Sequence, residues 1–204
     1  GRDPSFERSV AKRGLDGSDL ALYRPITVIN ADVKILCKIL ALRLKNVIKS
    51  LIHEDQCGFI PQRNTAMNLR RLAHVMHETV NRDSDQALVS IDISKSFNTV
   101  EWPYLMLVLA KLGIGPKFRQ WVQLLYTQPT GRVRMGLILS KEWNIGRGTW
   151  QGCPLSPLLF AIAIKPLVAW TCKVMLPCGI NVNGSSHLIS LYANDTLFYL
   201  NDST

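Results

Sequence analysis

The chain has 204 residues, which is enough for one large domain or two closely packed subdomains. Hydrophobic residues make up 47% and charged residues 19%, a composition that argues against an intrinsically disordered chain and permits a sizeable core. Lysine and arginine total 24 against 15 acidic residues, so the formal net charge is +9. This balance favours polyanionic partners, nucleic acid before an anionic membrane, and the alternative is a merely soluble basic protein.

Cysteine usage indicates a reducing compartment. The five cysteines form no C-x-x-C pair, and an odd count argues against a disulfide framework. No secretory signal is visible at the N-terminus, and the most apolar run, 157–164, ends at Lys165 and is too short to span a bilayer. We therefore expect an intracellular protein of the cytoplasm or nucleus that is neither secreted nor bound to a membrane.

The first predicted elements are a lead-in and a basic helix. Residues 1–20 are rich in charge, glycine and serine, and predict a loose lead-in. Over 32–52, apolar residues fall at helical spacing while lysines keep to the other side, which predicts an amphipathic helix. Such a helix can lie on a membrane or in a partner's groove, and its charges can equally form a solvated face. The apolar positions are Ile35, Leu36, Ile39, Leu40, Val47, Ile48 and Leu51, and the lysines are Lys34, Lys38, Lys45 and Lys49.

The middle of the chain alternates between loops, helices and strands. Residues 55–64 carry Gly and Pro and predict a loop, which is followed by a predicted helix over 66–80. Residues 87–92 form a β-prone run and predict a short strand that ends on a carboxylate. Further helices are predicted over 101–112, 117–126 and 154–170, and a further strand over 132–135.

The C-terminal part predicts a tight hairpin. Two β-prone runs, 188–192 and 196–200, flank the sequence Ala193-Asn194-Asp195, in which Asn and Asp tolerate turn geometry. Strands and helices interleave along the chain without a repeating βαβ unit, which indicates an α+β fold.

Two carboxylates stand where a metal site could form. Asp92 ends a predicted strand, and Asp195 lies at the predicted hairpin tip. Carboxylates at such positions can converge on a hard cation, which prefers oxygen ligands. Asp also ends strands for turn reasons, so the bare pair leaves both interpretations open. His74 and His77 have no further ligand at a suitable spacing, and we expect surface histidines there rather than a zinc site.

Five ordered sequence blocks surround these carboxylates. They are Tyr23–Ile26, Asp55–Arg63, Ser90–Phe97, Gly148–Pro157 and Tyr192–Asp195. In this order and spacing they resemble successive blocks of the reverse transcriptases of non-LTR (LINE-like) retrotransposons. The resemblance runs from Tyr23 to the last residue, and Gln-Gly-Cys-Pro-Leu-Ser-Pro is its most specific block.

The resemblance implies a right-hand polymerase fold. Its fingers, helical or mixed, would occupy 21–86, and its palm, built on a small antiparallel sheet with some finger-like elements inserted, would occupy 87–204. The chain ends at Thr204, so we expect an incomplete palm and no thumb. The implied reaction is two-metal addition of dNTPs to a DNA primer on an RNA template, with Mg²⁺ or Mn²⁺ as cofactor. Oligomeric state is left open.

The resemblance also implies roles for the residues near the metal. Asp92 matches the first metal-binding aspartate, and Asn194 and Asp195 match the hairpin positions. The backbone at Ile93 and Ser94 would face the incoming triphosphate.

Further matched positions would line the nucleotide and template. Phe97 matches the aromatic that lies under the sugar and excludes a 2′-hydroxyl, and its alternative is core packing. Gln151 and Gly152 match the nucleotide pocket, where glycine permits close approach of the backbone. The basic finger positions near template or triphosphate are Arg24, Lys34 and Arg63.

Three positions depart from the family pattern. The first hairpin aspartate is Asn194, whose amide oxygen can coordinate a cation but carries no charge. Asn98 stands where aspartate is usual, and Trp150 where arginine is usual. We therefore expect a polymerase by descent with impaired activity. The alternatives are a non-catalytic basic module that holds RNA or DNA, and a membrane-surface protein acting through the basic helix, which explains neither the Gln-Gly-Cys-Pro block nor the hairpin.

Overall fold

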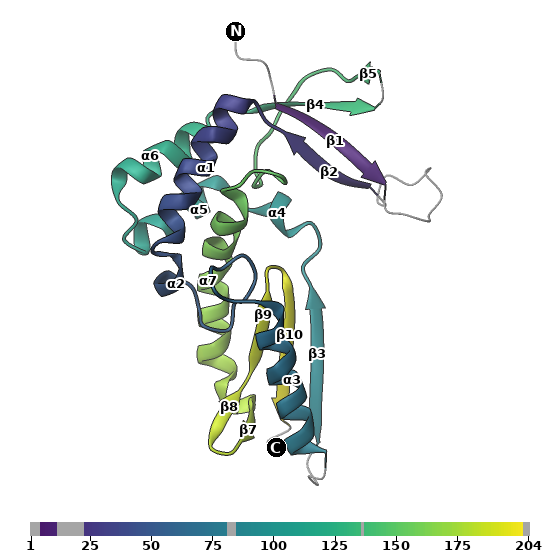
Figure 1. Ribbon diagram of the computed structural model, residues 1–204, viewed down its shortest axis with the longest axis vertical. Coiled ribbons are helices and arrows are strands. Elements are labelled where there is room, and N and C mark those ends of the chain that lie inside the picture. Colours follow the sequence, from purple (N-terminus) through teal and green to yellow (C-terminus); the bar gives the residue numbers. More distant parts are fainter. Residues whose placement is uncertain (1–4, 12–22, 81–84, 136, 202–204) are drawn as a thin grey trace. The chain divides into compact units, whose positions relative to one another are not determined.

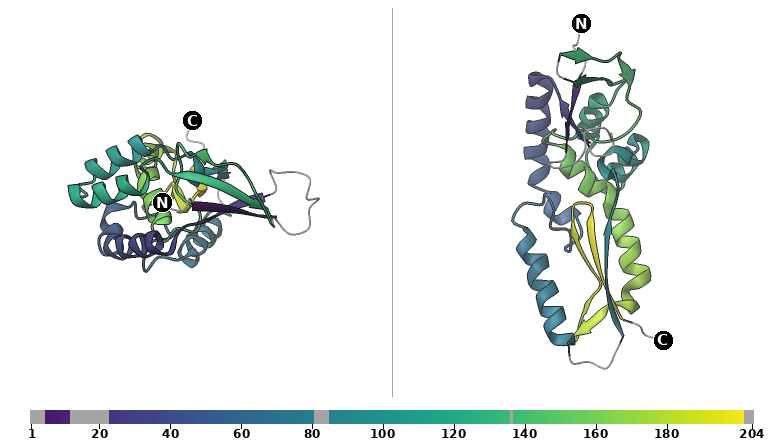
Figure 2. Two further views of the ribbon diagram at one scale, coloured as in Figure 1. Left: turned by 90° about the horizontal axis from the view of Figure 1, so that it is seen from above. Right: turned by 90° about the vertical axis from the view of Figure 1, so that its right-hand side faces the viewer.

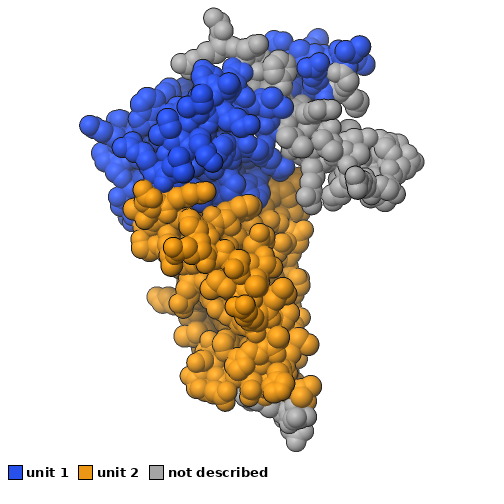
Figure 3. All heavy atoms as spheres, in the orientation of Figure 1, with its two compact units in different colours: residues 1–43, 97–159 blue, residues 44–96, 160–204 orange. Residues whose placement is uncertain are grey.

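The computed structural model describes residues 5–11, 23–80, 85–135 and 137–201 (Figure 1). The chain divides into two compact units, coloured separately in Figure 3. Unit 1 comprises Gly1–Arg43 and Phe97–Leu159, and unit 2 comprises Leu44–Ser96 and Phe160–Thr204. Each unit combines small sheets with helices, so the predicted α+β class is confirmed. The proposed fingers at 21–86 and palm at 87–204 stay a prediction, since each unit draws sequence from both.

The sheet of unit 1 contains a strand where we expect a loose lead-in. Its order is β2 (Tyr23–Val28), β1 (Ser5–Ala11), β4 (Thr130–Met135) and β5 (Ile138–Leu139), and β6 (Trp143–Asn144) also pairs with β4. β1 runs antiparallel to β2 and parallel to β4. Because a ladder is made by backbone groups, a segment with few apolar residues can still become a strand between two neighbours. The remainder of the predicted lead-in lies outside the described residues.

Strand β2 was not predicted from the sequence, and it contains a proline. Pro25 lacks a backbone donor and argues against a central strand. In the described sheet β2 stands at the end of the strand order, where a missing ladder donor costs little. The strand predicted at 132–135 is confirmed as β4, which begins earlier, at Thr130.

Two of the predicted helices form a pair in unit 1. They are α5 (Trp102–Lys111) and α6 (Pro116–Leu125), as predicted. Gly113 follows α5 with φ 75, a left-handed conformation that ends helices and favours glycine. Pro116 then opens α6, where its fixed φ suits the first helical turn and its missing N–H needs no partner. The 113–116 connection therefore stops one helix and starts the next.

The predicted basic helix is interrupted, and it buries a different stripe. It forms α1 (Ala31–Lys45) and the short α2 (Ile48–Leu51). All four lysines are exposed, but so are Ile35 at 63% and Ile39 at 50%. The buried stripe is Cys37, Leu40, Ala41, Leu44 and Ile48. Its spacing is helical, and it was misplaced because small Cys and Ala side chains take core positions that large residues were expected to fill.

Unit 2 is a three-layer arrangement around the predicted hairpin. Its antiparallel sheet has the order β3 (Gln86–Asp92), β10 (Asp195–Asn201) and β9 (Ile189–Tyr192). Helices α3 (Thr65–Thr79) and α7 (Ser156–Met175) lie on opposite faces of this sheet (Figure 2). The short hairpin β7 (Ile180–Val182) and β8 (Ser185–His187) and the one-turn helix α4 (Ser96–Thr99) escaped prediction.

Side chains alternate between the two faces of β10. Leu197 and Tyr199 pack with Val75 of α3, while Phe198 and Leu200 pack with Val168 of α7. This period of two is the strand signature, and both faces are apolar because both are covered by helices. The alternation fixes which face each remaining residue of the strand occupies.

Helix α7 is longer than predicted. It continues past Lys165 and Pro166 to Met175, and Ser156–Cys178 is long and apolar enough by composition to cross a membrane. The expectation of a run too short to span is therefore wrong. A share of 44% of the most apolar window is buried inside the protein, and core helices of soluble proteins have the same length and composition.

Two buried hydroxyl groups form a hydrogen bond between β9 and β10 of the unit 2 sheet. Ser190 and Tyr199 are 3.0 Å apart and both buried, and burial raises the pKa of the Tyr199 phenol, which keeps its proton. We expect Tyr199→Phe and Ser190→Ala each to lower the free energy of unfolding by about 1–3 kcal/mol, because each orphans a buried hydroxyl. The double variant should lose less than the sum. Urea titration measures the free energy of unfolding of the two single variants and of the double variant. Tyr192→Phe, at an exposed position, is the control. Additive losses in the double variant would refute the hydrogen bond between Ser190 and Tyr199.

Candidate active site

The pairing of β3 with β10 sets two carboxylates opposite one another. Asp195 is the register partner of Asp92, and both residues are exposed. Directly opposed residues of an antiparallel pair project from the same face of the sheet. Like charges in this arrangement repel, and a hard cation accepting both as oxygen ligands relieves that repulsion. The structure thus brings together the two carboxylates that the sequence singled out.

The hairpin tip adds an amide to this pair. Ala193 and Asn194 form a two-residue connection between Tyr192 and Asp195, and Ala193 has φ 56. Asn194 Nδ2 donates a hydrogen bond of 2.5 Å to Asp92 Oδ1. The carboxylate of Asp92 is therefore bound from within the protein, by a group that a carboxylate at position 194 could not supply.

The predicted nucleotide-pocket residues gather in unit 1. The carbonyl oxygen of Phe97 accepts a hydrogen bond of 2.7 Å from the Thr149 amide, and Gln151 Nε2 donates to Asn98 Oδ1 at 3.5 Å. The Gln151 carbonyl accepts from Thr27 N–H at 2.9 Å, which ties this loop to β2. Segments 97–98, 149–151 and β2 thus lie side by side.

Two glycines permit this arrangement. A Cβ on Gly148 would stand 3.0 Å from the Asn98 Cα, and its φ of 97 is strained for other residues. Gly152 is exposed with φ 100, as suits close approach of a ligand to the backbone. Phe97 is half-buried, so its position under a sugar and its alternative in the core both remain predictions.

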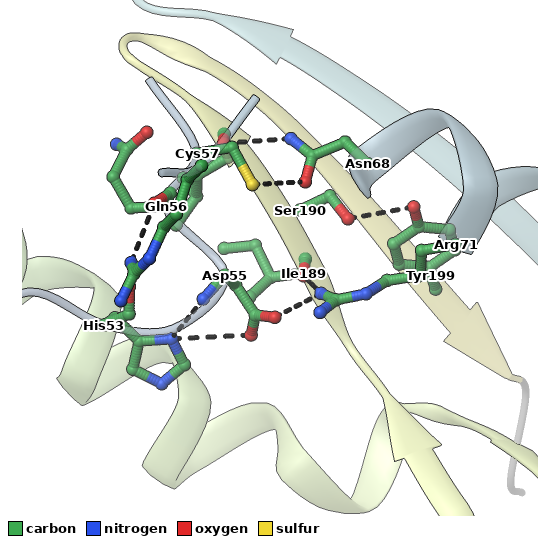
Figure 4. A network of polar contacts seen from close by, with 11 residues as sticks. His53, Asp55, Gln56, Cys57, Asn68, Arg71, Ile189, Ser190 and Tyr199 are labelled. Carbon is green, nitrogen blue, oxygen red and sulfur yellow. Dashed lines mark hydrogen bonds and ion pairs between the residues drawn. The ribbon is translucent and has the colours of Figure 1, made fainter. Parts of the chain in front are cut away.

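The edge of the unit 2 sheet is covered by polar groups that sequence reasoning missed. β9 is an edge strand, and the loop at 55–57 pairs with it: Leu191 N–H donates to the Asp55 carbonyl at 3.0 Å, and Cys57 N–H donates to the Leu191 carbonyl at 2.8 Å. Side chains of α3 continue the cover (Figure 4). Asn68 donates to the Leu191 carbonyl at 3.0 Å, and Arg71 donates to the Ile189 carbonyl at 2.8 Å while it pairs with Asp55. An edge that would otherwise expose its backbone groups is thereby satisfied.

Comparison with known proteins identifies the fold that carries this site. The profile of the family described as reverse transcriptase (RNA-dependent DNA polymerase) matches residues 10–204. The chain belongs to this family. The predicted relationship to non-LTR retrotransposons is confirmed by its relatives.

Two relatives define the branch. The transposon TX1 uncharacterized 149 kDa protein of Xenopus laevis is 29% identical over 180 residues, which cover 88% of this chain and 14% of that protein. The Pol polyprotein of the type-1 retrotransposable element R2 of Popillia japonica is 28% identical over 183 residues, covering 89% of this chain and 25% of that protein. The chain thus spans a quarter or less of the length of these relatives.

Solved structures agree on the fold. Telomerase from Candida tropicalis, in its apo form truncated from the C-terminal domain, superposes with a TM-score of 0.64 at 13% identity, over 98% of this chain and 44% of that one. Telomerase from Candida albicans, in complex with a fragment of telomeric RNA, gives 0.63 at 12% identity, over 98% of this chain and 38% of that one. At this identity the likeness establishes a reverse transcriptase fold.

The donor set of the reverse transcriptase hairpin suits a hard divalent cation, with one charge fewer than the family pattern. Asp92, Asp195 and the amide oxygen of Asn194 are all oxygen donors of the kind that Mg²⁺ and Mn²⁺ take. Among the described residues, no group of three or more His, Cys, Asp or Glu side chains converges on a common point. The charge available to a cation is therefore that of two carboxylates.

Arg63 donates hydrogen bonds to backbone carbonyls within the protein. Its Nη1 donates to the carbonyls of His53 at 2.6 Å and Gln56 at 2.9 Å, and its Nη2 to the Lys49 carbonyl at 3.3 Å. The guanidinium therefore joins α2 to the loop that covers β9. Its predicted contact with template or triphosphate stays a prediction.

The other positions that were predicted to contact the template or to face the triphosphate are found on separate elements. Arg24 is in β2 opposite Val10, and Lys34 is exposed in α1. Ile93 is half-buried and Ser94 exposed, directly after β3. The carboxylates belong to unit 2, and Phe97 and Gln151 to unit 1.

Trp150, which stands where the family pattern usually has arginine, is a packing residue in this protein. The Trp150 side chain is buried, with its ring 5.2 Å from that of Tyr126, which stacks on Trp102 at 5.3 Å. An arginine at this position would have to place a full charge within an aromatic cluster, which costs more desolvation than the buried indole N–H of Trp150, a donor with no hydrogen-bond partner among the described residues. His74 and His77 are exposed, and the His74 ring lies edge-on to that of His187 at 6.3 Å.

The Asn194–Asp92 hydrogen bond yields a prediction about cation binding. We expect Asn194→Asp to lower stability without metal by about 1.5–3 kcal/mol, because a hydrogen bond to a charged group becomes a repulsion. It should strengthen Mn²⁺ binding and enlarge the rise in Tm that Mg²⁺ produces. Calorimetric melting with and without Mg²⁺ and titration of Mn²⁺ by electron paramagnetic resonance measure both.

A matched control exists at the other hairpin. Asn183→Asp, at the β7–β8 turn where Asn183 has φ 50, adds the same charge away from Asp92. If Asn183→Asp raised Mn²⁺ affinity as much as Asn194→Asp, the effect would be one of net charge and the proposed ligand set would be wrong.

Proposed function

We propose that this chain is the polymerase core of a LINE-like reverse transcriptase, with a metal site weakened by Asn194. A reverse transcriptase domain implies an RNA template and nucleic-acid substrates, and the family normally uses divalent metals. The finer proposal is addition of dNTPs to a DNA primer, with Mg²⁺ or Mn²⁺ and without a membrane partner. The observation that carries it is the register pairing of Asp92 with Asp195, joined by the Asn194 hydrogen bond.

The residues of the hairpin tip would have distinct roles. The cations, when bound, would activate the primer 3′-hydroxyl and stabilise the leaving pyrophosphate. Asp92 and Asp195 would hold them through the carboxylates of two residues that are register partners on neighbouring strands. Asn194 would first have to release Asp92, and its amide oxygen would then neutralise none of the cation's charge.

The nucleotide would be held by unit 1 side chains and by backbone. Gly152, exposed with φ 100, would let the main chain approach the nucleotide without a Cβ in the way. Phe97 would lie beneath the sugar and exclude a 2′-hydroxyl. The cations Arg24 and Lys34 would attract the phosphates of template or triphosphate.

Primer extension tests the proposal in a whole protein. Residues 10–204 would replace the matching stretch of the R2 protein of Popillia japonica, with Asn194 kept or changed to Asp. If loss of one charged ligand costs on the order of 3–5 kcal/mol at the transition state, extension should rise roughly a hundredfold to several thousandfold in the Asp version. Asp92→Asn should abolish it in both. Equal, robust synthesis with Asn194 kept would refute the weakened site.

A second candidate is nucleic-acid binding without synthesis. The net charge of +9 and the exposed lysines of α1 and α2 favour it. In that case both versions of the chimera would be silent while binding persisted.

Phosphate neutralisation predicts how that binding depends on salt. We expect the chain to bind single-stranded RNA and duplex DNA with little sequence preference, and the association constant to fall linearly with salt on logarithmic axes. Changing Lys34, Lys38, Lys45 and Lys49 together to Gln should make this slope shallower by up to about one for each lysine that neutralises a phosphate. Fluorescence anisotropy at several salt concentrations measures it. A flat salt dependence in the parent chain would exclude the basic helix as a nucleic-acid surface.

A further inference from the structure

One buried glutamine binds the turn of the carboxylate hairpin from the side. Gln56 is 1% exposed, and it lies in the loop that covers the edge of β9 (Figure 4). Its Oε1 accepts from Ala193 N–H at 2.9 Å, and its Nε2 donates to the Ala193 carbonyl at 3.1 Å. Both backbone groups of Ala193 are thus held by a single side-chain amide, as a neighbouring strand would hold them.

The turn that Gln56 holds is one that alanine adopts at a cost. Ala193 has φ 56, in the left-handed region that disfavours residues with a Cβ. Such a conformation persists where the surrounding structure determines it. Ala193 is also 5% exposed, so its backbone groups have little access to water as an alternative partner.

The loop is built to bring Gln56 to this position. Gly58 N–H donates to the same Gln56 Oε1 at 2.8 Å, and a Cβ on Gly58 would stand 2.2 Å from the Ala193 nitrogen. Only glycine allows so close an approach. Arg63 holds the Gln56 carbonyl at 2.9 Å, so the backbone that carries the amide is itself fixed.

We propose that Gln56 is a positioning residue for the metal-binding tip of the hairpin. Its carboxamide fixes the backbone of Ala193 and thereby the direction in which Asn194 and Asp195 present their oxygens. The role of the tip in binding a cation rests on the proposed function, whereas the hold on Ala193 does not.

The test compares two glutamines of the same loop. Gln56→Met keeps the length of the side chain and removes all three hydrogen bonds, and Gln56→Glu keeps the acceptor for Ala193 N–H but loses the donor to its carbonyl. Gln62→Met is the control, since Gln62 is exposed and its Oε1 accepts a surface hydrogen bond from Lys49 Nζ at 2.9 Å. The readouts are hydrogen exchange of single amides by NMR and the Mn²⁺ dissociation constant by electron paramagnetic resonance, both on the whole chain well below Tm.

We expect Gln56→Met to accelerate exchange at Ala193 roughly tenfold more than at Tyr199, whose N–H is bonded to the Leu188 carbonyl in the same sheet. Mn²⁺ binding should weaken by roughly threefold to tenfold, and Gln56→Glu should restore part of the protection at Ala193. Gln62→Met should change neither. If Gln56→Met does not fold, Gln56→Glu against the parent carries the same comparison.

The outcomes separate this inference from the proposed function. Equal acceleration at Ala193 and Tyr199 would mean that Gln56 acts on global stability only, and would overturn the positioning role. Local acceleration at Ala193 with no Mn²⁺ binding by the parent or by Asn194→Asp would support the hold on the turn and overturn the metal site.

Discussion

The antiparallel register of β3 against β10 is the constraint on which the site depends. Side chains alternate along a strand, so a slip of one residue would send Asp92 and Asp195 to opposite faces of the sheet. Packing prevents this slip, because Tyr199 and Phe198 face different helices and neither would fit the environment of the other. The buried hydroxyl of Tyr199, bonded to Ser190, adds a polar penalty to any shift. The core of unit 2 thereby determines the geometry of two exposed carboxylates that take no part in it.

Asn194 places an amide, with no charge, beside the carboxylate of Asp92. Three carboxylates at one hairpin tip would repel each other and depend on a cation for compensation. With an amide at 194, Asp92 has an internal donor at 2.5 Å that compensates part of its negative charge. Under the proposed function, a cation would compete with this hydrogen bond and would gain less charge for doing so. Under that proposal, the amide at 194 would weaken cation binding in two ways, through a smaller attraction for the cation and through a metal-free state stabilised by the hydrogen bond.

Elements whose own sequence shows a periodic pattern or turn residues could be predicted from the sequence. Elements that depend on pairing or packing with another segment could not. Helices α3, α5 and α6 and the 189–201 hairpin follow from periodicity and turn residues. β1 lacked an apolar pattern, since backbone pairing with β2 and β4 makes it a strand. The α1 stripe was misplaced because Cys37 and Ala41 are core residues by location rather than size. At the site, the pairing of Asp92 with Asp195 could be expected, but the amide of Asn194 donating to Asp92 could not, because its direction depends on three-dimensional contact.

The block from Asp55 to Arg63 makes contacts within the protein that its resemblance to a family motif did not predict. Arg63, matched to a phosphate-binding position, gives both terminal nitrogens to backbone carbonyls, and Gln56 and Gly58 meet the hairpin turn. Each of these contacts requires its residue type. The planar guanidinium of Arg63 can donate to several carbonyls, and the amide of Gln56 supplies one donor and one acceptor. Gly58 has no Cβ that would collide with the backbone nitrogen of Ala193. Lysine at 63 would supply the charge for a phosphate but not the fork that joins three carbonyls. The observed contacts favour arginine over lysine at position 63, and the predicted contact of Arg63 with template or triphosphate stays a prediction beside them.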